Sequence, residues 1–300
     1  MKILLFGKTG QVGWELQRSL APLGDVVALS SQSADYAADF SEPLRLADTV
    51  RAVQPDIIVN AAAYTAVDKA QSEPDLAQRV NAQAPGVLAQ AAAQCGAWLV
   101  HYSTDYVFNG GGSKPWLEDA PTGPLSVYGQ TKLDGERAIQ AAGCRHLIFR
   151  TSWVYAARGG NFAKTMLRLG RERDALTVID DQFGAPTGAE LLADITAHAI
   201  RAVPRAPQLA GVYHLAAAGE TTWHGYAMFV LNYARRAGVP LRVTPDAVAA
   251  VPTQAFPTPA RRPHNSRLNT QKLQSAFGLH LPAWELGVAR MLDEILEGQA

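Results

Sequence analysis

Short apolar runs alternate with longer amphipathic segments through most of the chain. The apolar runs have the length of strands and lie at Lys2–Phe6, Asp25–Leu29, Asp56–Asn60, Ala97–Tyr102 and Arg145–Arg150. Helices are predicted between them, near residues 14–20, 42–53, 75–95 and 129–142. Strands that are apolar on both faces predict a parallel sheet with helices on both sides, the doubly wound α/β pattern. Further on, Glu190–Val203 and Gly211–Leu215 predict a helix and a strand that return to this sheet.

A glycine-rich turn directly follows the first apolar run. Gly7, Gly10 and Gly13 have the spacing G-x-x-G-x-x-G and lead into an amphipathic segment. Gly7 would allow a tight turn, Gly10 the close approach of a pyrophosphate, and Gly13 close packing of helix on strand. The N–H groups at the start of the helix would then face the phosphates. Strand, turn and helix in this order indicate a dinucleotide site; the alternative is a glycine-rich turn that binds nothing.

Tyr128 and Lys132 are four residues apart at the start of a predicted helix, so both side chains emerge from one face. An ammonium beside a phenol stabilises the phenolate, which predicts that the pKa of Tyr128 lies below its usual value near ~10. Such a tyrosine can exchange a proton with a sugar or alcohol oxygen. The same spacing is common on solvated helix faces, so its meaning depends on the rest of the chain.

Polar or small residues follow the carboxyl ends of the predicted strands, where doubly wound sheets bind their ligands. These segments are Gly7–Gly13, Ser30–Gln32, Asn60–Thr65, Ser103–Asp105 and Thr151–Trp153. Tyr128 and Lys132 can face the same rim. We expect a Rossmann-type NAD(P)-binding domain made of residues 1–150 plus about 189–216, and a smaller mixed α/β substrate lobe made of about 151–188 plus 217–300.

Composition excludes several classes of protein. The 300 residues are 48% hydrophobic and 18% charged, which is typical of a globular protein with a substantial core. Lys+Arg and Asp+Glu both total 27, so neither nucleic acid nor an anionic membrane is an expected partner. No signal peptide or spanning segment is visible, and Cys95 and Cys144 lack metal-ligand spacing. We therefore expect a cytoplasmic protein.

Longer motifs make the chain resemble one family. Besides the glycine turn and Tyr128–Lys132, the motifs are Asn60–Ala63, His101–Phe108, Phe149–Tyr155, Asn161–Met166, Asp181–Thr187 and Pro257–Pro263. In these stretches, and from residue 1 to about 296, the chain is similar to the dTDP-4-dehydrorhamnose reductases, which are extended short-chain dehydrogenases. The resemblance implies reduction of the 4-keto group of dTDP-4-dehydro-L-rhamnose to dTDP-L-rhamnose by NAD(P)H, the last step of dTDP-rhamnose biosynthesis.

The resemblance also implies roles for individual residues. Tyr128 would deliver a proton to the C4 oxygen, Lys132 would assist it and bind the nicotinamide ribose, and Thr104 would hydrogen-bond the same oxygen. Further cofactor contacts are expected from Gly7, Gly10, Gln11, Val12, Gly13, Ser30, Asp39, Phe40, Ala62, Ala63, Tyr64, Thr65 and Tyr102. Substrate contacts are expected from Asp105, Trp153, Arg261 and Arg262, with Asn161, Lys164 and Gln182 as candidates for the nucleotide pocket. The two arginines suit a diphosphate.

Departures from related enzymes narrow the reaction. Tyr106 stands where sugar-nucleotide dehydratases carry the glutamate of an Asp-Glu pair, so elimination lacks a partner. Both cysteines precede strands, at the edge opposite to the site, which disfavours epimerisation. No acid closes the second strand at Ser30 to hold a ribose 2′-OH, and no arginine is evident for a 2′-phosphate. The serines favour NADPH, with NADH as the alternative.

Family membership would also bring magnesium and a homodimer. Glu15, Glu190 and Glu294 match acidic positions of the family and could meet at a dimer contact; the alternative is three exposed helix glutamates. Two other functions stay open at this point. One is a non-catalytic dinucleotide-binding regulatory subunit, and the other is a reductase of a different nucleotide 4-keto sugar.

Overall fold

The computed structural model describes residues 1–297 and centres on a six-stranded parallel sheet with the order β10-β5-β4-β3-β1-β2. The strands are β1 (Lys2–Phe6), β2 (Asp25–Leu29), β3 (Ile57–Asn60), β4 (Trp98–Thr104), β5 (Arg145–Thr151) and β10 (Gly211–His214). All pairs in this sheet are parallel, so every carboxyl end lies at one edge. The predicted doubly wound α/β fold is confirmed.

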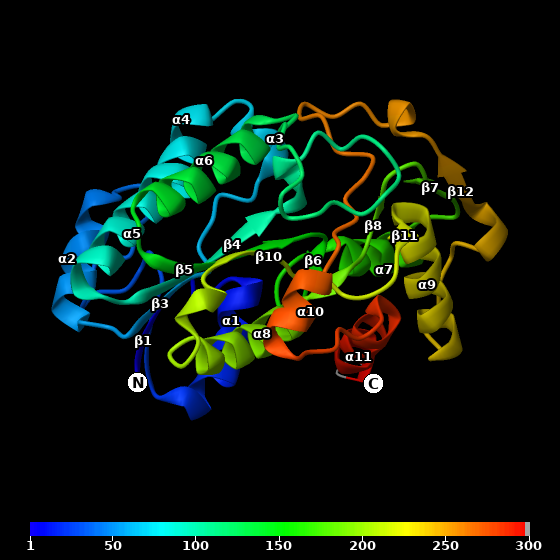
Figure 1. Cartoon of the computed structure of the whole chain (residues 1–300). Helices are drawn as coiled ribbons and strands as arrows, with labels where there is room; N and C mark the ends of the chain where they lie inside the picture. Colours follow the sequence, from blue (N-terminus) through cyan, green and yellow to red (C-terminus); the bar gives the residue numbers. More distant parts are fainter. Residues whose placement is uncertain (298–300) are drawn as a thin grey trace.

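Helices cover both faces of the sheet (Figure 1). One face carries α2 (Leu44–Val53), α5 (Ala84–Cys95) and α6 (Val127–Ala141), and the other carries α1 (Gln11–Leu20), α8 (Ala189–Ala202) and α10 (Gln271–Phe277). Alternation along β1 divides the core, because Ile3 and Leu5 join one cluster while Leu4 and Phe6 join the other. α10 falls in the range expected for the substrate lobe, yet it packs on the sheet side.

The predicted helix at 75–95 is interrupted in the structure. It consists of α4 (Pro74–Gln78), a turn of π-helix (η2, Arg79–Gln83) and then α5. Pro85 has no N–H to donate to the Asn81 carbonyl, which explains a disturbed ladder at this point. The Asn81 carbonyl instead lies against α6: a Cβ placed on Gly135 would be 2.1 Å from its oxygen. A glycine at this position therefore allows α6 to approach η2.

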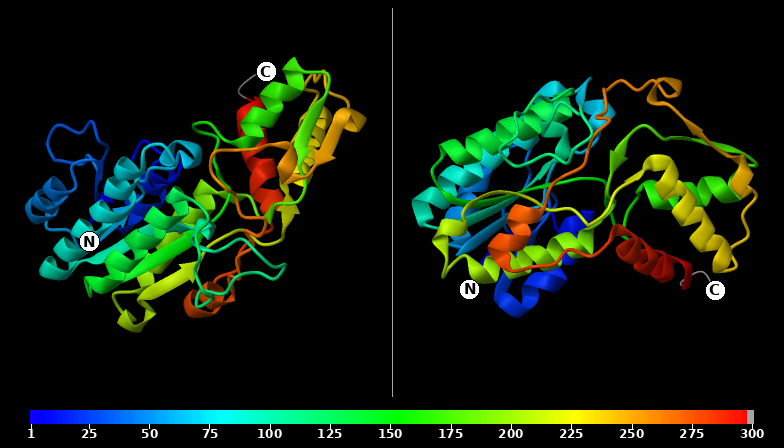
Figure 2. Two further views of the ribbon diagram at one scale, coloured as in Figure 1. Left: turned by 90° about the horizontal axis from the view of Figure 1, so that it is seen from above. Right: turned by 45° about the vertical axis from the view of Figure 1, so that its right-hand side comes forward.

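A second lobe packs at one end of the sheet (Figure 2). Its core is formed by α7 (Phe162–Glu172), α9 (Trp223–Arg236) and α11 (Trp284–Glu297) beside the parallel pair β7 (Leu176–Ile179) and β12 (Val248–Val251). Two-residue strands pair as β6 (Val154–Tyr155) with β9 (Thr187–Gly188), and β8 (Phe183–Gly184) with β11 (Thr221–Thr222). The remaining short elements are α3 (Val67–Ala70), η1 (Ala21–Leu23), η3 (Asp105–Val107), η4 (Pro207–Leu209), η5 (Pro245–Ala247) and η6 (Thr253–Ala255).

Across residues 1–297, every helix is too short or too polar to span a lipid bilayer.

The close approach of α6 to η2 gives a stability prediction. Gly135→Ala should lower the free energy of unfolding by at least about 1 kcal/mol, because the new Cβ must displace a backbone carbonyl. The gain in helix propensity, about 1 kcal/mol, does not relieve that contact. Gly160→Ala is the control, since nothing lies within 4 Å of its Cβ position. Urea unfolding of both variants measures the difference, and equal stabilities would contradict the packing argument.

Candidate active site

The glycine turn between β1 and α1 is tightly packed. Gly7 has a left-handed φ of +87°, and a Cβ there would lie 2.7 Å from the Ala61 carbonyl carbon. A Cβ on Gly13 would lie 2.0 Å from the Gly7 oxygen, whereas on Gly10 the nearest atom would be 3.5 Å away. Gly7 and Gly13 are thus required by packing, and Gly10 sits where the turn is open. This is the division of roles that the spacing predicts.

Several buried polar atoms have no hydrogen-bond partner among residues 1–297, and three of them lie at the glycine turn and at the ends of β4 and β5. These three are Gln11 Oε1 at the start of α1, Ser103 Oγ near the end of β4, and Thr151 Oγ1 at the end of β5. A buried polar group without a partner is costly, and such groups commonly await a ligand or water. The hydroxyls and phosphates of a dinucleotide are suitable partners, so these residues fit the cofactor that the resemblance implies.

Ser30 and Asp39 lie beside a cavity at the end of β2. The Ser30 N–H donates to Ser33 Oγ at 3.0 Å, and Asp39 accepts from the Ser41 N–H at 2.8 Å. The cavity is about 120 Å³, and its lining includes Ser31, Ser33, Asp39 and Arg45. Arg45 also lines this cavity and pairs there with Glu42 at 3.1 Å, so a contact with a 2′-phosphate stays a prediction. Arg45 lies on α2, a whole loop beyond the strand end, where a search near Ser30 does not reach it.

The side chains of Phe40 and Tyr102 are held away from the expected cofactor site. The Phe40 ring is in the core, edge-on to Phe6 with 5.5 Å between ring centroids. The Tyr102 side chain crosses to the other face of the sheet, where its hydroxyl contacts Thr196 Oγ1 of α8 at 2.6 Å. Burial raises the pKa of this phenol above its ordinary value. The structure therefore leaves the backbone carbonyl of Tyr102, not its side chain, on the active-site face.

The loop after β3 is fixed by two buried asparagines. Asn60 Oδ1 accepts from the Ala62 N–H at 3.0 Å, and the Asn81 amide bonds both the N–H and the carbonyl of Tyr64, at 2.9 and 3.0 Å. The Tyr64 hydroxyl bonds the Glu73 carboxylate. This clamping leaves Ala63 and Thr65 exposed at the rim. The Asn81 clamp was not recognised in the sequence, because Asn81 lies on a helix remote from any motif.

Thr104, Tyr128 and Lys132 come together at the carboxyl end of β4. Thr104 ends that strand, and Tyr128 lies in the first turn of α6, near enough for the Thr104 hydroxyl to oppose the rise in the pKa of Tyr128. Ser126 caps the helix by accepting from the Gly129 N–H at 3.2 Å, which fixes its start. Lys132 is 2% exposed, and its Nζ donates to the Tyr102 carbonyl at 2.6 Å. The geometry of the predicted trio is thus present.

The pKa prediction for the tyrosine was wrong for the free protein. Burial raises the pKa of Tyr128 above its ordinary value, and Lys132 does not lower it. Burial also lowers the pKa of Lys132, to about 8, with Glu136 opposing the shift. Both groups therefore shift toward their neutral forms, because removal from water disfavours the phenolate and the ammonium alike.

Of the two arginines expected at the diphosphate, only Arg262 is held near the trio. It pairs with Asp68 at 2.9 Å and lies near enough to Tyr106 to oppose the rise in the pKa of that phenol. The Tyr106 ring is edge-on to Tyr128, at 5.4 Å between centroids. Burial raises the pKa of Tyr106 to about 12. Arg261 is exposed. Asp68, which orients Arg262, carried no signal in the sequence because its partner lies almost two hundred residues away.

Asp105 is only 2% exposed, and both of its carboxylate oxygens are occupied. Ser266 Oγ donates to Oδ2 at 2.5 Å and Thr104 Oγ1 donates to Oδ1 at 3.1 Å. Burial raises the pKa of this carboxyl to about 7. Asp105 therefore lies behind Thr104 and ties β4 to the segment that carries Ser266.

The other substrate candidates belong to the second lobe. Trp153, with a φ of +50°, stacks on Trp223 at 3.7 Å between ring centroids. Asn161 caps α7, and Lys164 Nζ donates to the Ala157 carbonyl at 2.7 Å. Gln182 is buried and bonds Trp223 and Thr253. Each of these residues therefore has a clear structural partner, and substrate contacts by them stay a prediction.

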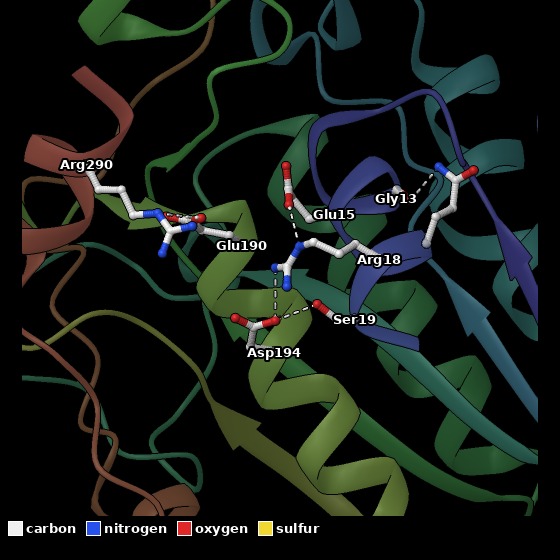
Figure 3. Close-up of polar contacts among 8 residues, drawn as sticks. Gly13, Glu15, Arg18, Ser19, Glu190, Asp194 and Arg290 are labelled. Carbon is white, nitrogen blue, oxygen red and sulfur yellow. Dashed lines mark hydrogen bonds and ion pairs between the residues drawn. The ribbon is translucent and has the colours of Figure 1, made fainter. Parts of the chain in front are cut away.

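Within residues 1–297 the three glutamates suggested for magnesium do not gather at one point, and their meeting at a dimer contact stays a prediction. Glu15 pairs with Arg18 and Glu190 with Arg290, each at 3.5 Å, as Figure 3 shows. Glu294 is exposed on α11. Among residues 1–297 there is no group of three or more His, Cys, Asp or Glu side chains that could hold a metal ion. Two of the expected ligands thus have an arginine as partner in the single chain.

Fold and site together define a class of protein. A parallel sheet with a glycine turn after β1, and a tyrosine and lysine one turn apart beside the end of β4, make a Rossmann-type oxidoreductase of the extended short-chain dehydrogenase class.

Comparisons with known proteins narrow the class to one family. The model of the RmlD substrate binding domain matches residues 1–297. The dTDP-4-dehydrorhamnose reductase of Escherichia coli (strain K12) is 63% identical over 295 residues, covering 98% of each chain. A dTDP-4-dehydrorhamnose reductase structure from Clostridium acetobutylicum has a TM-score of 0.87 and 34% identity, covering 99% of this chain and 100% of that one. The structure from Bacillus anthracis, in complex with NADP, has a TM-score of 0.86 and 33% identity over 98% and 99%. The chain belongs to the dTDP-4-dehydrorhamnose reductase family.

The buried carboxyl of Asp105 gives a prediction on stability and pH. Its pKa is about 7 in the folded protein, above its ordinary value of 3.8, so the folded state binds the proton more tightly. The stability from this group is complete below the lower value and is lost as pH rises through the higher one. Asp105→Asn cannot titrate, so the wild type should lose more stability than the variant between about pH 5 and 8. Urea unfolding at both pH values measures this, and parallel pH profiles would contradict it.

Proposed function

We propose that the protein reduces the 4-keto group of dTDP-4-dehydro-L-rhamnose to dTDP-L-rhamnose, with NADPH as the reductant. One observation carries the proposal: Thr104, Tyr128 and Lys132 meet at the carboxyl edge of the sheet, the same edge as the glycine turn. Relatives named dTDP-4-dehydrorhamnose reductase support the choice of substrate.

The residues of the chain act on the oxygen of the carbonyl. Bound NADPH supplies the hydride to the carbonyl carbon. As the C4–O double bond becomes single, negative charge grows on oxygen, and Tyr128 donates its phenolic proton there. Thr104 Oγ1 donates to Asp105 Oδ1 in the free protein, so its hydroxyl must turn from Asp105 in order to donate to the same oxygen. Lys132 lies behind the tyrosine, where an ammonium stabilises the phenolate that remains.

The neighbours of the trio support reduction without elimination or epimerisation. Elimination would need a second carboxylate next to Asp105, and the aromatic residue Tyr106 stands there. The oxygens of Asp105 itself are bonded to Ser266 and Thr104. Cys95 ends α5 and Cys144 precedes β5, which places both at the amino edge of the sheet. No thiol of the chain is thus near the proposed reacting carbon.

Arg45 and its surroundings favour NADPH over NADH. The cavity at the end of β2 brings Ser31, Ser33 and Arg45 together, and these groups suit a 2′-phosphate once Arg45 turns from Glu42, its partner at 3.1 Å in the same lining. The relative from Bacillus anthracis is described as a complex with NADP, which agrees.

The two-part division of the chain is likewise a proposal, in which residues 1–150 and about 189–216 bind the cofactor and the second lobe binds the sugar nucleotide. The homodimer, magnesium and a cytoplasmic location stay predictions.

Two other functions are separated by one assay. A regulatory subunit would bind NADPH but not consume it, and a reductase for another sugar would turn over only with a different nucleotide 4-keto sugar. Purified protein, dTDP-4-dehydro-L-rhamnose and NADPH should show falling absorbance of the reduced cofactor, with dTDP-L-rhamnose as the product.

Removal of the phenolic proton should abolish most turnover. Tyr128→Phe should lower kcat by about 10²–10⁴-fold, the usual contribution of a positioned acid, while the Kd for NADPH stays unchanged. Tyr233→Phe is the matched control, because it removes a hydroxyl that bonds Asp293 on the surface of the second lobe. Steady-state kinetics and a fluorescence titration with NADPH measure the two effects. A Tyr128→Phe enzyme with wild-type kcat would sink the proposal.

Loss of Arg45 should change the choice of cofactor. Arg45→Ala should raise the KM for NADPH about tenfold, as expected for one charge-assisted contact to a phosphate, and leave the KM for NADH unaltered. Arg51→Ala is the control, since Arg51 lies on the same helix and pairs with an acid three residues away, as Arg45 does. If both variants retain wild-type KM values for NADPH, Arg45 does not contact the 2′-phosphate.

A further inference from the structure

A chain of buried polar groups lies behind the proposed catalytic lysine. Asn60 of β3 and His101 of β4 are paired in register, and each is 1% exposed. The Asn60 Nδ2 atom is 3.0 Å from His101 Nδ1, and His101 Nε2 is 3.3 Å from Lys132 Nζ. Lys132 also donates to the Tyr102 carbonyl. The chain therefore runs from the loop after β3, through one imidazole, to the ammonium of α6.

The direction of each hydrogen bond in this chain follows from its first member. The Ala62 N–H can only donate, and it lies 3.0 Å from Asn60 Oδ1, so that atom is the amide oxygen. The amide nitrogen of Asn60 then faces His101 and donates, which makes Nδ1 an acceptor. A neutral imidazole carries one proton, and here it must be on Nε2. This N–H points at Lys132 Nζ.

An N–H aimed at Nζ works against the ammonium form of Lys132. An ammonium has three donors and no acceptor, whereas a neutral amine has a lone pair that can accept from Nε2–H. The Tyr102 carbonyl accepts a hydrogen from either form. Burial acts in the same direction, because it lowers the pKa of Lys132 to about 8. His101 itself stays neutral, since burial and the nearby lysine hold its pKa well below the ordinary value.

The other charged and titratable groups around Lys132 are already bonded elsewhere. Glu136, one turn along α6, forms a buried pair with Arg150 of β5 at 2.7 Å. On the remaining elements packed against α6, Asp105 of η3 bonds Ser266 and Thr104, and Asp68 of α3 bonds Arg262. The phenol of Tyr128, on α6 itself, lies near Thr104, and burial raises its pKa so that it stays neutral. His101 is thus the titratable side chain in direct contact with the Lys132 amine.

We propose that His101 is a positioning residue, held by Asn60 with its proton on Nε2, which disfavours the ammonium of Lys132 in the free enzyme. Lys132 then takes up a proton from solvent when ribose hydroxyl oxygens offer it acceptors. The charge that stabilises the Tyr128 phenolate would arise only when cofactor is in place. This inference rests on the proposed function for the position of the ribose beside Lys132.

The tautomer of His101 in the free protein is the first test. In a sample labelled with ¹⁵N-histidine, we expect His101 Nδ1 to have the chemical shift of an unprotonated ring nitrogen and Nε2 that of a protonated one. The chain has seven histidines, and the resonances missing from the His101→Gln variant identify this one. A proton on Nδ1, or a protonated ring, overturns the inference.

The second test is the titration of Lys132 in the free protein. In a sample labelled with ¹³C-lysine, the signal absent from Lys132→Arg identifies the residue. His101→Gln can turn its amide oxygen toward the ammonium, so it should raise the pKa of Lys132 by about one unit and move the alkaline limb of the kcat/KM profile upward with it. His214→Gln is the matched control, because His214 is equally buried on β10 and bonds the Asn269 carbonyl instead. An unchanged Lys132 pKa in His101→Gln overturns the positioning role.

The third test needs no variant, so it remains decisive if His101→Gln fails to fold. Calorimetric titration with NADPH alone, in two buffers of different ionisation enthalpy, counts the protons taken up on binding. About one pH unit above the pKa of Lys132 we expect uptake of close to one proton per site. Binding without proton uptake overturns the inference. Apart from the kcat/KM profile, these measurements need no sugar substrate, so failure of the proposed sugar specificity would be seen separately.

Discussion

Enclosure of one primary amine determines the arrangement of the site. An ammonium removed from water is strongly disfavoured unless it is well bonded, and Lys132 is 2% exposed. Its partners are a backbone carbonyl and an imidazole of β4, so α6 must lie very close to that strand. Two glycines of α6 make this approach feasible. A Cβ on Gly129 would be 2.3 Å from the Tyr106 oxygen, and one on Gly135 would meet Asn81 equally closely. Tyr128, fixed on the same helix, is thereby brought to Thr104.

Much of the sheet could be predicted because its signal is local. Each strand is a short apolar run, and its carboxyl end is followed by small or polar residues, so both the fold and the rim of the site follow from the order of the segments. The trio at the end of β4 follows for the same reason. The direction of the pKa shift of Tyr128 does not, because it depends on how deeply α6 and β4 enclose the phenol. No pattern within either segment contains that information.

Long-range contacts account for most of what the sequence did not reveal. Arg45 reaches the cavity that Ser31 lines from α2. Asp68 orients Arg262, although the two residues are far apart in the sequence. Tyr102 and His101 are neighbours in one strand, yet alternation sends their side chains to opposite faces. In the second lobe, strands of two residues have no periodicity to detect. Trp153 differs from these residues, because its motif is evident in the sequence although its stacking on Trp223 is not.

The position of β10 in the sheet has a consequence for synthesis of the protein. β10 (Gly211–His214) pairs with β5 (Arg145–Thr151), yet α7 and the first strands of the second lobe lie between them in the chain. On the ribosome, β5 would therefore emerge with an unpaired edge that stays open while some sixty further residues are made. Open strand edges are templates for intermolecular pairing. The sheet therefore cannot be completed until the first elements of the second lobe have been made.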